Sequence, residues 1–533
     1  MTPFLRPLLP KLLTEAIGTF YLTFCVGMSA KANPAAPLCI GGVLVAMVFA
    51  GGHVSGAHYN PTVTAAVFVR GRFGSKTALG LSPLAAALYV VAQLVGAYIG
   101  GACALGLVGQ DSLGYPSFPS EKLGPAIGAE CLWSFLLATV VLNVATAKAQ
   151  DNNNYYGLAI GFTVLSGAVV VGGLSGGAFN AAVGLALPAL AGEGSQLWVY
   201  LVFPTLSGAA AGAFFRFTSP ADFGVVHTGV FAVLPALAME WLATFFLSLY
   251  VAFSPSFGGS RMSELAMLAV TVALLSTAGA TSGCHMNPAV SVGVYLRSLR
   301  SPIAAGFSMQ KLSAYVVAQC MGAACAAAIA AAMLDSHPTL GIHAPIGYPL
   351  PAPASTAPKA FFAELIGTAA LVYVVLNVAT VRHLARNSFF GMAIGITIAA
   401  IGSAIGPVSG GCLNPAVGLL AVFGTAWGQA ANGGTFTSAW IYFVAPPLGG
   451  VIAALLFRLQ NYEAEYSPEA YVADTEVSSS SAHALPTAHA PTPLALHGVP
   501  ASASCPAAPT MPLASSTLTP ARVRCRWQSA TKR

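Results

Sequence analysis

The stretch Ser409-Gly410-Gly411-Cys412-Leu413-Asn414-Pro415-Ala416-Val417-Gly418 lies inside strongly apolar sequence and predicts a helix that begins abruptly. Its glycines permit unusual backbone angles, Asn414 can cap a helix with its side chain, and Pro415 suits the first helical position. Only about ten apolar residues follow, whereas a helix needs roughly 20 to cross a bilayer. We therefore expect this helix to begin at membrane depth, where an unwound turn must line a cavity.

The composition of the whole chain is that of a membrane protein. Of its 533 residues, 7% are charged and 56% are hydrophobic, which excludes an ordinary soluble domain. The net charge of +6 therefore does not indicate a nucleic-acid partner. The ten cysteines show neither the spacing of a disulfide framework nor that of a metal site, so we expect no metal and no other cofactor.

Twelve apolar runs are long enough to span a membrane as helices, which predicts an all-α polytopic fold. Four shorter apolar stretches, each about half a membrane long, follow Asn60, Asn180, Asn287 and Asn414 and are candidates for re-entrant half-helices. The twelve long runs cover residues 12–31, 38–53, 83–107, 125–147, 155–173, 196–217, 231–253, 263–280, 310–334, 359–380, 389–407 and 436–458.

An internal repeat of four units is the strongest signal in the sequence. Each unit has a glutamate within an apolar helix, at Glu15, Glu130, Glu240 and Glu364. An asparagine element follows each glutamate after 45 to 50 residues, namely Asn60-Pro61-Thr62, Asn180-Ala181-Ala182, Asn287-Pro288-Ala289 and Asn414-Pro415-Ala416. Each unit has three spanning helices and one half-helix. Because three is an odd number of crossings, successive units enter the membrane from opposite sides and form inverted repeats. We predict two such pairs, residues 1–220 and 221–460.

Loop charges agree with this topology. If both chain ends are cytoplasmic, the outer side receives only four basic residues, Lys31, Lys122, Arg261 and Lys359. The inner side then receives thirteen, as the positive-inside rule requires: Arg6, Lys11, Arg70, Arg72, Lys76, Lys148, Arg216, Arg297, Arg300, Lys311, Arg382, Arg386 and Arg458. Residues 461–533 are rich in Ala, Pro, Ser and Thr, and we expect a disordered cytoplasmic tail there.

The half-helices predict a chemistry. Two helices that meet N-terminus to N-terminus each place a partial positive charge of about one half at the membrane midplane, which repels cations and protons. The asparagine amides can donate to a passing oxygen, so water and small hydroxylated molecules keep hydrogen bonds that an ion loses. Since this chemistry needs no catalyst, we do not expect an enzyme.

At these elements the sequence resembles the aquaporin and glycerol-facilitator family, the major intrinsic proteins. The resemblance covers about residues 1–460 and is carried by the Ser-Gly-x-His-x-Asn-Pro and Ser-Gly-x-x-x-Asn-Pro-Ala elements with their upstream glutamates. It implies two fused six-helix bundles with a pore through each, and glutamates that hold the re-entrant loops. It also implies a dimer of fused chains in place of that family's tetramer.

The sequence departs from the family pattern where the outer mouth of each pore narrows. Three residues after the second asparagine, the family usually has an arginine, whereas this chain has Val183 and Val417. The other constriction positions of the family are placed by their number of residues from the asparagines. They fall on Ile40, Ala168 and Gly177 in the first unit and on Met267, Gly402 and Gly411 in the second. We therefore expect wide, apolar constrictions. Ala181, in place of a proline, predicts looser positioning of one half-helix.

The resulting hypothesis is a passive channel in contact with membrane lipid, for water or small uncharged solutes of the glycerol, urea and ammonia class. One alternative is a secondary transporter, because inverted repeats and broken helices also serve alternating access. Another is that only the second unit conducts, while the first serves as a scaffold for assembly.

Overall fold

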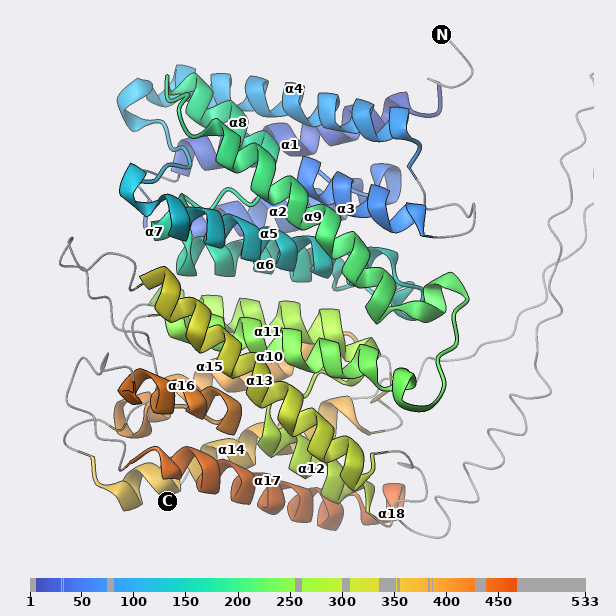
Figure 1. The fold of residues 1–533 in the computed structure, drawn as a ribbon, viewed down its shortest axis with the longest axis vertical. Coiled ribbons are helices and arrows are strands. Elements are labelled where there is room, and N and C mark those ends of the chain that lie inside the picture. The colour runs from blue at the N-terminus through green and yellow to red at the C-terminus, as the bar shows by residue number, and fades with distance from the viewer. Residues whose placement is uncertain are drawn as a thin grey trace, which may run out of the picture. The chain divides into compact units, whose positions relative to one another are not determined.

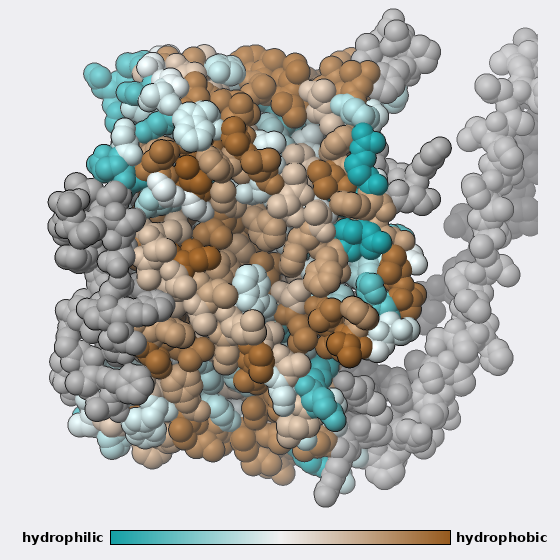
Figure 2. Space-filling model, in the orientation of Figure 1, coloured by the Kyte–Doolittle hydropathy of each residue, from teal (hydrophilic) through white to brown (hydrophobic). Residues whose placement is uncertain are grey.

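A computed structural model describes residues 6–29, 31, 33–73, 81–254, 261–299, 307–334, 351, 355–381, 384–385, 387–426 and 438–466. All secondary structure in these ranges is helical (Figure 1). Eleven of the described helices are long and apolar enough to cross a membrane. Apolar side chains cover the middle of the face shown in Figure 2, and polar ones gather toward the helix ends. The chain is therefore an integral, multi-pass, all-α membrane protein.

The first half contains six long helices and two short ones that follow Asn60 and Asn180. The long helices are α1 (Leu9–Ser29), α2 (Ala36–Ser55), α4 (Pro83–Val108), α5 (Leu123–Thr146), α6 (Tyr156–Val170) and α9 (Leu197–Thr218). The short helices are α3 (Pro61–Arg72) and α8 (Ala181–Leu190). Single turns are formed by α7 (Gly172–Ser175) and by the 3-10 helices η1 (Gln110–Ser112), η2 (Ser120–Lys122), η3 (Lys148–Gln150), η4 (Pro220–Phe223) and η5 (Gly229–Ala232).

The second half repeats this order. Its long helices are α10 (Leu234–Phe253), α11 (Arg261–Ser282), α13 (Met309–Leu334), α14 (Ala357–Ala379), α15 (Phe390–Ser409) and α17 (Trp440–Gln460). Its short helices, α12 (Pro288–Ser298) and α16 (Pro415–Ala426), follow Asn287 and Asn414. A last turn, α18, covers Tyr462–Glu465.

Each of the twelve predicted runs coincides with one of these long helices, and their ends differ by a few residues. The predicted run 155–173 differs most, because α6 has only 15 residues. The chain leaves helical geometry at Val171 and continues for one turn in α7. The two glycines that open α7 weaken the helix here, so this segment falls below the usual spanning length.

The folded part of the second half extends beyond residue 460, where the sequence predicted a disordered tail to begin. Glu465 accepts a hydrogen bond from Nη2 of Arg297 at 2.7 Å, and the hydroxyl of Tyr466 donates to the Arg297 carbonyl at 2.8 Å. Residues 461–466 therefore pack against α12. The rest of the predicted tail, residues 467–533, lies outside the described residues.

The two halves contact each other within the compact unit Met1–Glu476. Helices α5 and α6 of the first half pack against α10 and α11 of the second (Figure 1). Trp133 of α5 meets Phe246 of α10 edge to face, with ring centroids 5.9 Å apart. The carboxamide of Gln150, just after α5, donates to the Ser276 carbonyl of α11 at 2.9 Å.

Candidate functional site

The asparagine side chains begin the four short helices. Oδ1 of Asn60 accepts a hydrogen bond from the N–H of Thr62 at 2.9 Å. The equivalent bonds at Asn180, Asn287 and Asn414 measure 3.0, 2.8 and 2.9 Å. Each side chain thus satisfies one of the N–H groups that a helix start leaves without a partner. The bond at Asn180 is as well formed as the others, so the looser positioning predicted from Ala181 has no counterpart in this contact.

The same side chains join the two short helices of each half. Nδ2 of Asn60 donates to the Phe179 carbonyl at 2.8 Å, and Nδ2 of Asn180 donates to the Tyr59 carbonyl at 2.8 Å. In the second half, Asn287 donates to Leu413 and Asn414 donates to Met286, both at 2.8 Å. The helix starts therefore meet face to face through two reciprocal bonds. Each carboxamide carries two N–H hydrogens, so one remains for another acceptor.

The residue before each asparagine has a strained backbone. Tyr59, Phe179, Met286 and Leu413 have φ values of +48°, +47°, +52° and +54°. A non-glycine residue in this left-handed region costs of order 1–3 kcal/mol and persists only when its surroundings hold it. The contacts that hold these turns are hydrogen bonds to buried glutamates.

Glu240 illustrates the arrangement that all four glutamates share. Its carboxylate is 0% exposed and accepts from the Ser282 hydroxyl at 2.7 Å, from the N–H groups of His285 and Met286 at 2.8 Å, and from Nε2 of Gln319 at 2.8 Å. Equivalent bonds from one serine hydroxyl and two backbone N–H groups reach Glu15, Glu130 and Glu364. The carboxylates therefore organise the turns that lead into the short helices.

A cavity of about 60 Å³ passes the asparagine pair of the first half. Its lining includes both asparagines and all four predicted constriction residues of this half, namely Asn60, Asn180, Ile40, Ala168, Gly177 and Val183. A neighbouring cavity of about 460 Å³ shares Ile40 and Ala168 with it. These two side chains therefore stand where a wider space meets the narrow one.

The asparagine pair of the second half lies in a much larger cavity of about 670 Å³. Three predicted constriction residues line it, namely Met267, Gly411 and Val417. The fourth, Gly402, is not part of the lining and instead packs behind Gly411, because a Cβ on Gly411 would lie 2.5 Å from the Gly402 carbonyl oxygen.

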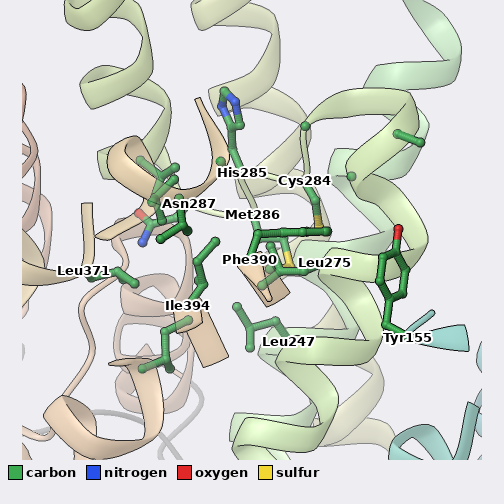
Figure 3. A pocket seen from close by; sticks show the side chains of 18 of the residues that line it. Tyr155, Leu247, Leu275, Cys284, His285, Met286, Asn287, Leu371, Phe390 and Ile394 are labelled. Carbon is green, nitrogen blue, oxygen red and sulfur yellow. The ribbon is translucent and has the colours of Figure 1, made fainter. Parts of the chain in front are cut away.

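Part of the wall of the second cavity is formed by apolar side chains. Figure 3 shows Leu247, Leu275, Leu371 and Ile394 around the same space as Asn287. These side chains offer no hydrogen bonds to a solute, whereas the asparagine amides in the same lining can donate them. Within the described ranges, no group of three or more His, Cys, Asp or Glu side chains is arranged to hold a metal ion.

The sequence patterns did not reveal the further polar side chains that hydrogen-bond to the glutamates and to the short helices. Gln319 donates to both Glu240 and the Ser291 hydroxyl, at 2.8 and 3.0 Å, and Gln93 makes the equivalent bonds in the first half. Nδ1 of His285 lies 3.0 Å from the Ser291 hydroxyl. A glutamine at equivalent places in two apolar runs was a usable signal, because buried amides require partners.

Arg70 and Arg297 also have a role that loop charge alone did not indicate. They lie in the last turns of the short helices α3 and α12, ten residues after Asn60 and Asn287, and both are buried. Arg70 forms an ion pair with Asp222 at 3.1 Å, and Arg297 forms one with Glu465 at 2.7 Å. In each half a carboxylate that follows the last long helix thus fixes the far end of the first short helix.

The sequence profile of the family described as "Major intrinsic protein" matches residues 7–216 and 239–457. The chain is 35% identical over 216 residues to "Glycerol uptake facilitator protein-like 6" of Lactiplantibacillus plantarum, covering 38% of this chain and 95% of that protein. It is 34% identical over 217 residues to Nodulin-26 of Glycine max, covering 39% of this chain and 76% of that protein. A solved structure, the aquaglyceroporin from Plasmodium falciparum, matches with 22% identity and a TM-score of 0.33. The match covers 42% of this chain and 94% of that chain.

Proposed function

Because the chain belongs to the major intrinsic protein family, which matches it once in each half, we propose that residues 1–220 and 221–460 each form a pore. The chain is then a passive channel for water and small uncharged solutes. The observation that carries this proposal is the reciprocal asparagine pair within a cavity, present in both halves. Swelling of vesicles that contain the purified chain tests it, as developed in the Discussion.

The geometry favours neutral solutes over ions. Two helix N-termini meet at each asparagine pair and add their partial positive charges, which opposes cations and protons. The apolar wall gives an ion nothing in exchange for its hydration shell, whereas one amide hydrogen per asparagine suits a hydroxyl or carbonyl oxygen.

The same geometry disfavours a secondary transporter. Glu240 and Glu364, the buried carboxylates of the second half, accept hydrogen bonds from the turns and do not line the cavity. A carboxylate engaged in this way is a structural acceptor, so it does not provide a site that binds and releases a coupling ion during transport.

The two cavities favour different solutes. The cavity at the second asparagine pair has a volume of about 670 Å³, whereas the cavity at the first pair has about 60 Å³ and adjoins a further space of about 460 Å³. We assign larger neutral solutes such as glycerol and urea to the second pore, and water to the first.

Arginine at the constriction of the second pore should reduce the permeability to larger solutes more than the permeability to water. Val417 is 4% exposed and lines the cavity, as does Met267. Val417→Arg places a long cationic side chain there, and we expect glycerol permeability to fall by about tenfold, equivalent to about 1.4 kcal/mol of barrier, with a smaller effect on water. Stopped-flow light scattering measures both. Val183→Arg, the matched change in the first pore, should leave glycerol flux largely intact, and equal losses in both variants would contradict the assignment.

We propose that two chains assemble side by side. In the spanning windows of α5, α10 and α11, 72%, 78% and 72% of residues are buried, because the halves cover one another there. In the equivalent windows of α1, α2, α14 and α15, only 44%, 28%, 39% and 28% of residues are buried. A two-fold axis that sets α14 and α15 of one chain on α1 and α2 of the next would cover both faces. Native mass spectrometry should then give twice the chain mass, and a monomer at every concentration would contradict this.

We also propose that both chain ends face the cytoplasm, since thirteen of seventeen assigned basic residues then lie on the inner side. An epitope tag at either end should be accessible only after the membrane is permeabilised.

A further inference from the structure

One end of the second cavity is built by the first half of the chain. Residues of the loop between α5 and α6 contribute to its lining, namely Lys148, Ala149, Gln150, Asp151, Asn152, Asn153 and Tyr155. We propose that residues 148–155, here called the bridging segment, form part of the mouth of the second pore and help to set the rate at which solutes pass through it. This inference rests on the proposed channel function.

The bridging segment lies at the end of the cavity opposite the constriction. Met267, near the start of α11, and Gly279, near its end, both line the cavity. Twelve helical residues separate them, which corresponds to about 18 Å. Gly279 lies against Phe390, where α15 begins after the α14–α15 loop, and Leu384 and Asn387 of that loop also line the cavity. The mouth is thus framed by two equivalent loops, one from each half.

Contacts with the second half hold the bridging segment in place. Gln150 is 6% exposed and donates to the Ser276 carbonyl at 2.9 Å, while the Tyr155 hydroxyl donates to Oε1 of Gln150 at 3.0 Å. The ring of Tyr155 meets Phe390 edge to face at 5.9 Å. Figure 3 shows Tyr155, from the first half, on the same side of the cavity as Leu275. The segment is therefore bonded to α11 and packed against α15, both of which line the second pore.

The first half is bonded to the same segment from the other side. The backbone N–H of Lys148 donates to Oδ1 of Asp222 at 3.3 Å, and Asp222 is the ion-pair partner of Arg70 at the end of α3. The position of the segment is thus determined by a short helix of the first pore and by the wall of the second.

The bridging segment adds polar groups to this mouth at positions where the second half has apolar ones. Gln150 lies 30 residues before Asn180, and the residue 30 before Asn414 is Leu384. Tyr155 likewise corresponds to Phe389. Solutes that have crossed an apolar wall must regain hydrogen bonds as they leave, and the polar groups of residues 148–153 offer them. They should therefore lower the exit barrier for hydroxylated solutes.

Asp151 is the position best suited to a test. It is exposed and lines the cavity, and its side chain is not among those that fix the segment to α11. We expect Asp151→Trp in the full chain to lower glycerol permeability about threefold, which corresponds to about 0.7 kcal/mol of barrier. Glu193→Trp, in another exposed loop of the first half, should leave it unchanged. Size-exclusion profiles and melting temperatures of both variants should match the unsubstituted chain.

The same substitution in a chain with a disabled second pore shows which of the two pores it affects. When Asn287→Asp and Asn414→Asp disable the second pore, adding Asp151→Trp should change the residual water flux no further. An unchanged glycerol flux in the Asp151→Trp chain would overturn the proposal, and so would an equal fractional loss of water flux in the disabled background. Failure of the channel function itself gives a different result, because the unsubstituted chain would then pass no solute faster than protein-free vesicles.

Discussion

Replacing Asn287 and Asn414 together with aspartate should nearly abolish glycerol flux while the chain remains folded. Nδ2 of each asparagine donates to the carbonyl before its partner, at 2.8 Å. A carboxylate cannot donate, so two acceptors would face each other at both contacts, at a cost of about 1–3 kcal/mol each. The substituted chain keeps its helix caps, because carboxylate oxygens still accept from the N–H groups of Ala289 and Ala416. We expect at least about a tenfold loss of flux, a barrier increase of about 1.4 kcal/mol or more, measured in vesicles.

The matched control changes the same atoms in the first half. Asn60→Asp with Asn180→Asp removes the equivalent donors to Phe179 and Tyr59. Because the cavity there is only about 60 Å³, this variant should lose water flux and keep most glycerol flux. If glycerol flux disappeared in the control and persisted in the Asn287 and Asn414 variant, the roles assigned to the two pores would be wrong. If the control lost no flux of any kind, the first half would be a scaffold.

Glu240→Ala should have the largest effect on stability. The change removes the acceptor of four hydrogen-bond donors at a residue that is 0% exposed. These donors are the Ser282 hydroxyl, the His285 and Met286 N–H groups and Nε2 of Gln319. At about 1–3 kcal/mol for each unsatisfied buried donor, the total reaches at least about 4 kcal/mol. This is a large part of the 5–15 kcal/mol by which domains are typically stable. The strained turn at Cys284 and Met286, with φ of +49° and +52°, loses its support as well.

The melting temperature of the chain in detergent measures this loss. A cost of about 4 kcal/mol should lower it by roughly 10 °C. Glu240→Gln keeps the side-chain volume and one acceptor oxygen. Its melting temperature should therefore lie between that of the unsubstituted chain and that of Glu240→Ala. Glu193→Ala changes an exposed loop residue and should have no effect. An alanine variant as stable as the unsubstituted chain would show that the carboxylate does not hold the turn.

The features predicted from sequence were those with a local or a repeated cause. Asparagine caps, permissive glycines and apolar runs act within one or two helical turns, so Asn414 and its neighbours indicated a helix start without knowledge of the fold. The fourfold recurrence then revealed the inverted repeat, because no single copy distinguishes a half-helix from a loop turn.

Features that depend on distant segments could not be predicted in this way. The partner of Arg70 is Asp222, 152 positions away, and the bridging segment meets α11 more than 120 positions along the chain. The larger volume of the second cavity also depends on distant segments, because residues 148–155 of the first half form part of its lining. Such differences arise from how whole helices pack.

The swelling of proteoliposomes in water and glycerol gradients, followed by stopped-flow light scattering, tests the central claim most directly. Vesicles that contain the purified full chain should respond to both gradients faster than protein-free vesicles, and Asn287→Asp with Asn414→Asp should remove the glycerol response selectively. Rates equal to those of protein-free vesicles for water, glycerol and urea alike would contradict the account.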